Sequence, residues 1–318
     1  MASLCTTSFK LNTGYSIPAI GLGTWQGTPG TDESELLQST IKYALSQGYH
    51  CIDTAAAYEV EEDVRAAIAE SEVPREEIFV VTKLWNAMHD RVEEAFLTSL
   101  QKLGLEYIDL YLMHWPMSSD DQMNVLDHPT PAETWLSMEA LIKKYPTKLR
   151  SIGVSNFSEK TIKPLLEVAT IIPAVNQIEI HPMLPQFELV DAFAKHGILT
   201  MAYSPLGQYN SPVLTHPDII ALAEKYKVPT GALVLSWEVQ RGIVAVPKST
   251  NKERIVSNIT LLPELSPEDK KVLDEFHLRK GMHRRLCTVG NGVRPTGNDI
   301  VFGWTYEQLG WETFTVDE

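Results

Sequence analysis

Short apolar runs alternate along the chain with longer stretches in which apolar residues recur every three or four positions. That recurrence is typical of amphipathic helices, whereas the short runs predict buried strands. Eight strands are expected, at residues 19–23, 50–53, 78–82, 108–114, 149–154, 174–179, 199–202 and 243–246. The helices expected between them include residues 33–46, 92–103, 134–144 and 186–196.

Strands that alternate with helices indicate a parallel sheet, and eight strands can close into a barrel filled by side chains. The pattern therefore predicts an α/β fold of the (β/α)8 TIM-barrel class. An Asn12-Thr13-Gly14 turn between residues 8–11 and 16–18 predicts an N-terminal β-hairpin. No linker, short repeat or low-complexity tract interrupts residues 1–318, so a single domain is expected.

Two segments break the alternation, residues 117–130 and the C-terminal tail at 278–318. Long loops at the catalytic face of such a barrel usually decide specificity. We interpret both as lids over a pocket, the alternative for the tail being disorder. Its aromatic content argues against disorder, with side chains at Phe302, Trp304, Tyr306, Trp311 and Phe314.

Charge and composition narrow the functional classes. The chain has 27 basic and 41 acidic residues, a net charge of −14, which argues against nucleic acid or an anionic membrane as partner. Three scattered cysteines form neither a disulfide framework nor a metal site. No run approaches the roughly 18 apolar residues of a membrane span. The first residues lack a signal-peptide pattern, so a cytoplasmic location is expected.

Polar residues follow three of the apolar runs. Asp53 and Tyr58 follow the second run, Lys83 the third, and His114 ends the fourth. The C-terminal ends of all strands meet at one face of a (β/α)8 barrel, so these side chains are expected to share a pocket. An ammonium near a Tyr hydroxyl favours the phenolate and lowers its pKa, and an Asp can hold the Lys in place. Such a Tyr can protonate a forming alkoxide.

With these residues in view, the sequence resembles the aldo-keto reductases, of the fungal sugar-aldehyde reductase type. The resemblance covers roughly residues 8 to 280, in the expected order. Its catalytic-face motifs are Gly21-Leu22-Gly23-Thr24-Trp25, Ile52-Asp53-Thr54-Ala55 with Tyr58, Thr82-Lys83-Leu84-Trp85 and His114-Trp115-Pro116. Its cofactor motifs are Gly153-Val154-Ser155-Asn156-Phe157, Asn176-Gln177, Tyr203-Ser204-Pro205-Leu206-Gly207 and Pro247-Lys248-Ser249-Thr250 through Arg254 and Asn258.

The resemblance implies an NADPH-dependent reduction of aldehydes to alcohols. Tyr58 would be the general acid, Lys83 and Asp53 would tune it, and His114 would orient the carbonyl. The N-terminal hairpin would plug the bottom of the barrel. Trp25, Trp85 and Trp115 would wall the substrate pocket, since an apolar, aromatic pocket with few polar anchors suits small carbonyl compounds.

The resemblance also implies a cofactor lying extended across the barrel mouth. No Gly-x-Gly-x-x-Gly precedes a helix, which argues against a Rossmann site. Tyr203 would stack on the nicotinamide, and Ser204 and Leu206 would line the pyrophosphate path. The carboxamide would be bound by Ser155, Asn156 and Gln177.

The segment from Lys248 to Arg254 can cap a helix whose N-terminus attracts phosphate. The Ser249 and Thr250 side chains and the two cations form a candidate 2′-phosphate site, which favours NADPH and leaves NADH as second choice. Asn258 lies one turn further along that helix and, by the resemblance, contacts the adenine.

The chain departs from the family where Glu59-Val60 follows Tyr58 in place of Gly-Asn. His283, Arg284 and Arg285 in the tail suggest a second substrate class, uronates such as galacturonate, because Arg suits carboxylate recognition. His181 is interpreted as structural, and no metal site is expected. The competing functions are a non-catalytic regulatory protein on the same scaffold and a phosphosugar isomerase. The expected partner is a small-molecule aldehyde, bound by a monomer or a homodimer.

Overall fold

The computed structural model describes residues 4–26, 30–208, 211–260, 262–287 and 300–312. Eight parallel strands form a nearly closed barrel in which each strand pairs with its neighbour in the sequence. They are β3 (Leu22–Gly23), β4 (Cys51–Asp53), β5 (Phe79–Leu84), β6 (Leu110–Met113), β9 (Ile152–Ser155), β10 (Val175–Glu179), β11 (Leu199–Tyr203) and β12 (Val244–Val246). The predicted (β/α)8 fold is confirmed.

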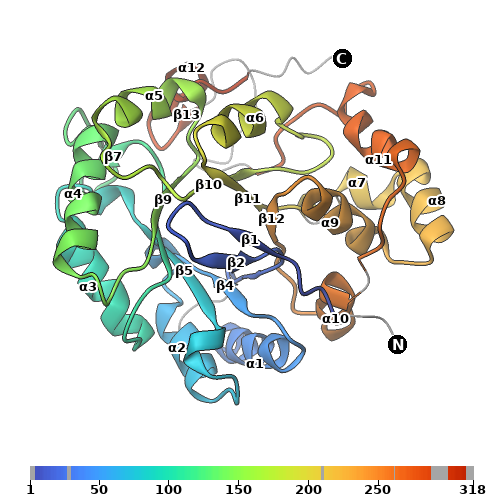
Figure 1. The fold of residues 1–318 in the computed structure, drawn as a ribbon, viewed down its shortest axis with the longest axis horizontal. Coiled ribbons are helices and arrows are strands. Elements are labelled where there is room, and N and C mark those ends of the chain that lie inside the picture. The colour runs from blue at the N-terminus through green and yellow to red at the C-terminus, as the bar shows by residue number, and fades with distance from the viewer. Residues whose placement is uncertain (1–3, 27–29, 209–210, 261, 288–299, 313–318) are drawn as a thin grey trace.

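Helices surround the strands (Figure 1). The long ones are α1 (Asp32–Ser46), α2 (Glu61–Ala69), α3 (Val92–Leu103), α4 (Pro131–Lys144), α5 (Glu159–Val168), α6 (Phe187–Lys195), α8 (Pro217–Tyr226), α9 (Thr230–Gln240), α10 (Lys252–Thr260) and α11 (Pro267–Asp274). Shorter turns are η1 (Ala56–Tyr58), η2 (Arg75–Glu77), η3 (Asn86–Met88), α7 (Pro212–Thr215) and η4 (Phe276–Leu278). No helix in the described part of the chain combines the length and apolar character that crossing a bilayer needs.

The first and last barrel strands close the ring through backbone contacts beside β3. Ile20 bridges Ala245 in parallel register, and the Ala245 N–H donates to the Ala19 carbonyl at 2.9 Å. The Gly23 N–H donates to the Pro247 carbonyl at 3.1 Å, one step further along. Closure removes the exposed sheet edges that an open eight-stranded sheet would carry.

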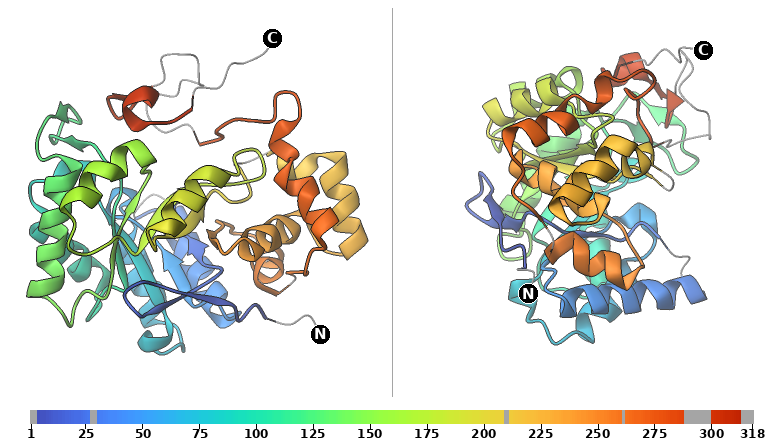
Figure 2. Two further views of the ribbon diagram at one scale, coloured as in Figure 1. Left: turned by 45° about the horizontal axis from the view of Figure 1, so that its top comes forward. Right: turned by 90° about the vertical axis from the view of Figure 1, so that its right-hand side faces the viewer.

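The predicted N-terminal hairpin is present as β1 (Ser8–Lys10) and β2 (Ser16–Pro18). Leu11 and Ile17 belong to the apolar cluster that fills the barrel interior. The Asn12 side-chain amide donates to the Pro173 carbonyl at 3.0 Å, just before β10 begins. The hairpin therefore covers the N-terminal ends of the strands, on the opposite side of the barrel from the C-terminal segment (Figure 2).

The two segments that interrupt the alternation fold against each other. Residues 117–130 include the small hairpin β7 (Ser118–Ser119) and β8 (Val125–Leu126), and the tail includes β13 (Ile300–Val301), β14 (Trp304–Thr305) and α12 (Tyr306–Leu309). Trp115 and Met117 form one buried cluster with Val301, Tyr306 and Leu309. The tail is thus packed where the structure describes it, while residues 288–299 and 313–318, including Phe314, lie outside the described residues.

Candidate active site

The strand alternation decides which polar side chains enter the barrel mouth. Cys51 and Val81 belong to the apolar cluster inside the barrel. Since side chains two apart on a strand point the same way, Asp53 and Lys83 also point inward, nearer the C-terminal ends. The same spacing relates Leu112 to His114, Val175 to Gln177, and Met201 to Tyr203.

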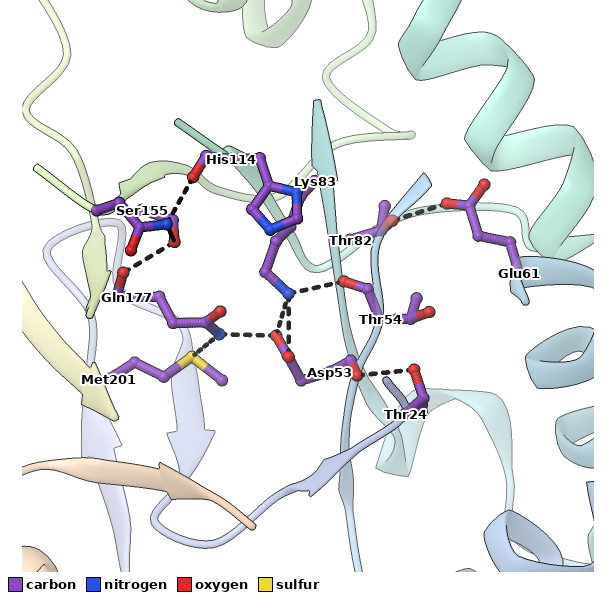
Figure 3. A network of polar contacts seen from close by, with 11 residues as sticks. Thr24, Asp53, Thr54, Glu61, Thr82, Lys83, His114, Ser155, Gln177 and Met201 are labelled. Atoms are coloured by element: carbon purple, nitrogen blue, oxygen red, sulfur yellow. Dashed lines mark hydrogen bonds and ion pairs between the residues drawn. The ribbon is translucent and has the colours of Figure 1, made fainter. Parts of the chain in front are cut away.

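Lys83 is the centre of the buried polar network (Figure 3). Its ammonium donates to both Asp53 carboxylate oxygens, at 2.9 and 3.0 Å, and to the Thr54 carbonyl at 2.9 Å. Lys83 is 0% exposed and Asp53 4%. The Gln177 amide donates to the same Asp53 carboxylate at 2.7 Å, which ties β10 to β4. Burial lowers the pKa of Lys83, and the Asp53 charge opposes that shift.

Tyr58 lies at the end of η1, above this pair. The Lys83 ammonium is 5.2 Å from the centroid of its ring, and the His114 ring is 5.8 Å away, edge-on. Burial raises the pKa of Tyr58 well above its usual value, and the Asp53 charge adds to the rise. The expectation that Lys83 lowers this pKa is therefore wrong for the net shift. Two causes explain it: Lys83 is already paired with Asp53, and burial disfavours the phenolate.

His114 faces Tyr58 from the end of β6. Its side chain is 8% exposed, and Nδ1 has no hydrogen-bond partner among the described residues. Burial lowers the pKa of His114 well below its usual value, and the Lys83 charge adds to the effect. An uncharged imidazole therefore stands beside a protonated phenol in the barrel mouth.

Aromatic side chains from the tail complete the wall around His114. Trp85 packs edge-on against His114 at 5.4 Å and against Phe302 at 5.3 Å between ring centroids. Trp115 lies 5.3 Å from Phe302 and 5.8 Å from Trp311. Two of the three predicted wall residues therefore come together. The third, Trp25, is 67% exposed, and no ring contact joins it to the others in the described structure.

The four residues predicted to bind the nicotinamide form one connected polar group. The Tyr203 hydroxyl donates to the Asn156 side-chain oxygen at 2.8 Å. The Asn156 amide donates to the His114 carbonyl at 3.0 Å and to the Ser155 hydroxyl at 3.1 Å. Ser155 donates to the Gln177 carbonyl at 2.8 Å. Asn156 adopts the left-handed conformation (φ 66°), which Asn tolerates better than most residues.

The residues predicted to line the pyrophosphate path, Ser204 and Leu206, and to contact the adenine, Asn258, lie along the chain from β11 to α10. Ser204 follows β11 in the left-handed conformation (φ 48°) and accepts a hydrogen bond from the Cys287 thiol at 2.9 Å. Leu206 packs against apolar clusters on both sides of it. Asn258 is buried on α10, and its side-chain oxygen lies near Gly231.

The cations beyond β12 fit a phosphate. Lys248 and Arg254 are both exposed, and α10 begins between them at Lys252. The Asn251 side chain accepts from the Arg254 N–H at 2.9 Å, and the Ser249 hydroxyl from the Asn251 N–H at 3.2 Å, while Thr250 lies between them. Burial lowers the pKa of Lys248, and the nearby Arg254 charge adds to this. The Glu33 charge opposes this shift. Two neighbouring cations at the start of a helix are expected where an anion binds.

The structure shows how the turn after Tyr58 accommodates Glu59, where the sequence departs from the family's Gly-Asn. Glu59 adopts the left-handed conformation (φ 58°), and its N–H donates to the Ala56 carbonyl at 3.1 Å. Gly or Asn adopts this conformation at lower cost than Glu. The Glu59 side chain is exposed, so its charge points to solvent while the turn keeps Tyr58 at the mouth.

The tail arginines divide into two kinds. Arg284 is exposed, whereas Arg285 is 7% exposed and lies 3.5 Å from the Glu179 carboxylate. Sequence reasoning did not identify Glu179 as a site residue. The signal that could have found it is its position two residues after Gln177 on the same strand. His181, interpreted as structural, donates from Nε2 to the same carboxylate at 3.0 Å.

Comparison with known proteins identifies a family model, relatives and a solved structure that are similar to this chain. A family model described as Aldo/keto reductase family matches residues 19–277. Glycerol 2-dehydrogenase (NADP(+)) of Saccharomyces cerevisiae is 44% identical over 299 residues, with 88% of this chain and 93% of that protein covered. D-galacturonate reductase of Hypocrea jecorina is 41% identical over 289 residues, with 86% and 91% covered. The solved structure of a Bombyx mori aldo-keto reductase in complex with NADP matches with a TM-score of 0.82 and 37% identity, covering 90% of this chain and 96% of that one.

Proposed function

The chain belongs to the aldo/keto reductase family of oxidoreductases, and on that premise we propose that it reduces aldehydes to alcohols with NADPH. The observation that carries this proposal is the buried Lys83–Asp53 pair beneath Tyr58. A fully buried ammonium is seldom retained without a task, because burying a charge is costly even when it is paired.

The chain's own residues would manage the proton. A bound nicotinamide supplies the hydride, which no side chain can. Tyr58 holds its proton at neutral pH, since burial raises its pKa, and so can donate it to the carbonyl oxygen. Lys83 would stabilise the phenolate that remains, and Asp53 keeps the ammonium in place. His114, uncharged because burial lowers its pKa, would orient the carbonyl without competing for the proton.

The substrate class follows from the wall of the mouth, which suits sugar aldehydes and other small polar aldehydes. Trp85, Trp115 and Phe302 supply apolar surface, while Tyr58 and His114 supply two polar anchors. Few polar groups in an apolar pocket are typical of small-molecule sites. Lys248 and Arg254 support NADPH over NADH, because only NADPH carries a 2′-phosphate for them to bind.

The test is NADPH oxidation with xylose, arabinose, glyceraldehyde, galacturonate, glucuronate and benzaldehyde. Removing the hydroxyl in Tyr58→Phe should lower kcat about 10²–10⁴-fold, the usual contribution of a positioned general acid. NADPH binding, measured by fluorescence titration, should be unchanged. Full activity in Tyr58→Phe would exclude Tyr58 as the proton donor.

Tyr111→Phe is the matched control. Tyr111 is also buried, and its hydroxyl has no hydrogen-bond partner in the described chain. It lies on β6 on the side that packs against the helices, with Phe96 5.6 Å from its ring. Removing that hydroxyl should leave kcat unchanged, so a loss specific to Tyr58 cannot be a general effect of losing a buried phenol.

A uronate is the second candidate substrate, supported by the exposed Arg284 and by the Hypocrea jecorina relative named for galacturonate. Arg285 is a weaker candidate for the clamp, because Glu179 already pairs with it. In Arg284→Ala, a uronate reductase should lose affinity for galacturonate and keep its activity on xylose. Equal KM values for galacturonate in Arg284→Ala and the wild type would exclude the clamp.

A further inference from the structure

Strand β10 carries a second inward-facing carboxylate, Glu179, above the catalytic network. Val175, Gln177 and Glu179 alternate on the strand and point into the barrel. Val175 lies in the apolar interior, and Gln177 contacts Asp53. Glu179 is the last residue of the strand and is 1% exposed. It therefore lies at the level where substrate and tail meet.

Glu179 binds the C-terminal segment directly. One of its carboxylate oxygens accepts from the backbone N–H groups of Leu286, at 2.6 Å, and Cys287, at 2.9 Å. The other oxygen lies 3.5 Å from the Arg285 guanidinium. Three consecutive tail residues thus contact one carboxylate from the barrel.

Arg285 extends this anchor to the pocket wall. Its guanidinium lies over the Trp311 ring, 3.7 Å from the centroid. Trp311 packs on Trp115 at 5.8 Å, and the Trp115 ring is stacked on His114 at 6.3 Å. A continuous series of contacts therefore runs from Glu179 to a residue that faces the substrate.

The tail leaves open space on its outer side. A cavity of about 560 Å³ lies between the first turns of α5 and α6 and the tail, with Arg285 and Trp311 in its lining. At the far end, the Ser158 hydroxyl donates to the Leu309 carbonyl at 2.6 Å. The cavity separates Arg285 from α6, so this segment of the tail is held from the barrel side. Glu179 binds it there, together with the Cys287 thiol, which donates to the Ser204 hydroxyl at 2.9 Å, and the Arg284 N–H, which donates to the Met183 carbonyl at 3.2 Å.

We propose that Glu179 is a positioning residue that holds the C-terminal segment over the barrel mouth and thereby sets the affinity for the aldehyde. The inference rests on the proposed function for its kinetic consequence. Burial by itself raises the pKa of Glu179, but the hydrogen bond from His181 and the charges of His181 and Arg285 outweigh it, and the net shift is downward. The anchor is accordingly an ionised carboxylate at neutral pH.

Glu179→Gln tests the charge with little change of shape. It should raise KM for the preferred aldehyde about tenfold and leave kcat nearly unchanged, because the wall contacts the substrate before and during the reaction. The KM for NADPH should stay constant. Hydrogen exchange of the backbone amides in residues 283–287 and 306–312 should become faster.

Glu139→Gln is the matched control. Glu139 is equally buried and also accepts two backbone N–H groups, from Thr170 at 2.7 Å and Ile171 at 2.8 Å. It joins α4 to the segment after α5, away from the mouth. This variant should change thermal stability and leave the KM and the tail exchange unchanged.

Arg285→Met supplies a second route to the same result. It should raise the KM for the aldehyde to a similar extent. The double variant with Glu179→Gln should have a KM no higher than either single variant, because each single variant already breaks the same Glu179–Arg285 contact. An unchanged KM in both single variants would overturn the proposal, even if the tail exchanges faster. If the wild type reduces no carbonyl compound, the proposed function fails instead, and unchanged tail exchange in Glu179→Gln would then overturn the anchor separately.

Discussion

Lys83 and Glu238 are both fully buried, yet their surroundings differ. Lys83 donates to three oxygens and is held in a complete polar network. Neither carboxyl oxygen of Glu238, on α9, has a hydrogen-bond partner in the described structure. Burial raises the pKa of Glu238 well above its usual value, and the Arg241 charge opposes this only in part. Burial therefore favours the neutral form of the Glu238 carboxyl in the folded chain.

Glu238→Gln should make the protein more stable, increasingly so as the pH rises. A folded-state pKa above the unfolded value, about 4.3 for Glu, means that wild-type stability is greatest below that value and falls as the pH rises toward the folded pKa. Gln does not titrate, so the variant escapes this loss. Urea unfolding should show a gain of about 1–3 kcal/mol at pH 8 and a smaller one at pH 5. An equal gain at both pH values would contradict this reading.

Motifs predicted which catalytic-face residues come together but not the direction of every pKa shift among them. Asp53, Tyr58, Lys83 and His114 meet in the mouth as predicted, because the strand ends of a parallel barrel converge. The direction of the Tyr58 pKa shift was predicted wrongly, because burial depends on what covers the site. That cover is built by long-range tertiary contacts, which no local pattern specifies.

At the scale of elements, one carboxylate joins neighbouring parts of the barrel at the end opposite the mouth. Asp109, just before β6, accepts from the Val80 N–H of β5 at 2.9 Å. It also pairs with Arg75 of η2 at 2.7 Å and with Arg150, which precedes β9, at 2.8 Å. Asp109 is 1% exposed, so these contacts are shielded from water. They help to set the register of β5, β6 and β9.

Asp109→Asn should lower the free energy of unfolding by about 3 kcal/mol, since removing one member of a buried charge cluster leaves the others unpaired. Urea unfolding measures the loss. Asp90→Asn is the control, because its pair with Arg91 is exposed and its removal should cause no measurable change. Equal stability of the two variants would show that the Asp109 cluster does not hold the strands.

The observed helix boundaries agree with the predicted ones where apolar residues recur with a clear helical period. The helix predicted at residues 92–103 is α3, Val92–Leu103. The helix predicted from residue 134 begins earlier, at Pro131, because Thr130 caps it with a hydrogen bond from the Glu133 N–H at 3.3 Å. The strand predicted at 108–114 is shorter, at Leu110–Met113. The β7–β8 hairpin within residues 117–130 was not foreseen.

At the scale of the whole molecule, a net charge of −14 surrounds a small basic site. Lys248 and Arg254 stand at the start of α10, where backbone N–H groups also favour an anion. A phosphate approaching an acidic protein is repelled at long range and attracted only locally. Salt screens both effects, and under the proposed function the local pair would discriminate NADPH from NADH.

Arg254→Ala should raise KM for NADPH about tenfold, the cost of one charge-assisted contact to phosphate, and leave KM for NADH unchanged. The wild-type preference for NADPH should also weaken as salt is added. Steady-state kinetics with both cofactors at several salt concentrations measures both effects. Lys252→Ala is the control, because Lys252 lies on the same helix but over the Tyr43 ring, 5.1 Å from its centroid. Equal losses for both cofactors would contradict a 2′-phosphate site.

The sequence by itself determined the barrel and most members of the buried polar network. Short apolar runs, helical periodicity and polar residues at strand ends are local signals, and closure of a parallel barrel brings the strand ends together whatever the course of the loops. Asp53, Lys83 and His114 therefore followed from pattern and spacing, whereas Gln177 was predicted only through the family resemblance, as a cofactor ligand.

The tail was predicted from the sequence to cover the mouth, but tertiary structure alone decided which of its residues contact the barrel. Contacts between Glu179 and residues 285–287 join positions more than one hundred apart in the chain, and Trp115 meets Trp311 across a still longer separation. Residue pairs that are far apart in the chain leave no periodic signal in the sequence. Each partner, taken alone, resembles an ordinary residue of a strand end or of the tail. Burial and the pKa values that depend on it are set by these long-range contacts, which is why the network could be predicted and its electrostatics could not.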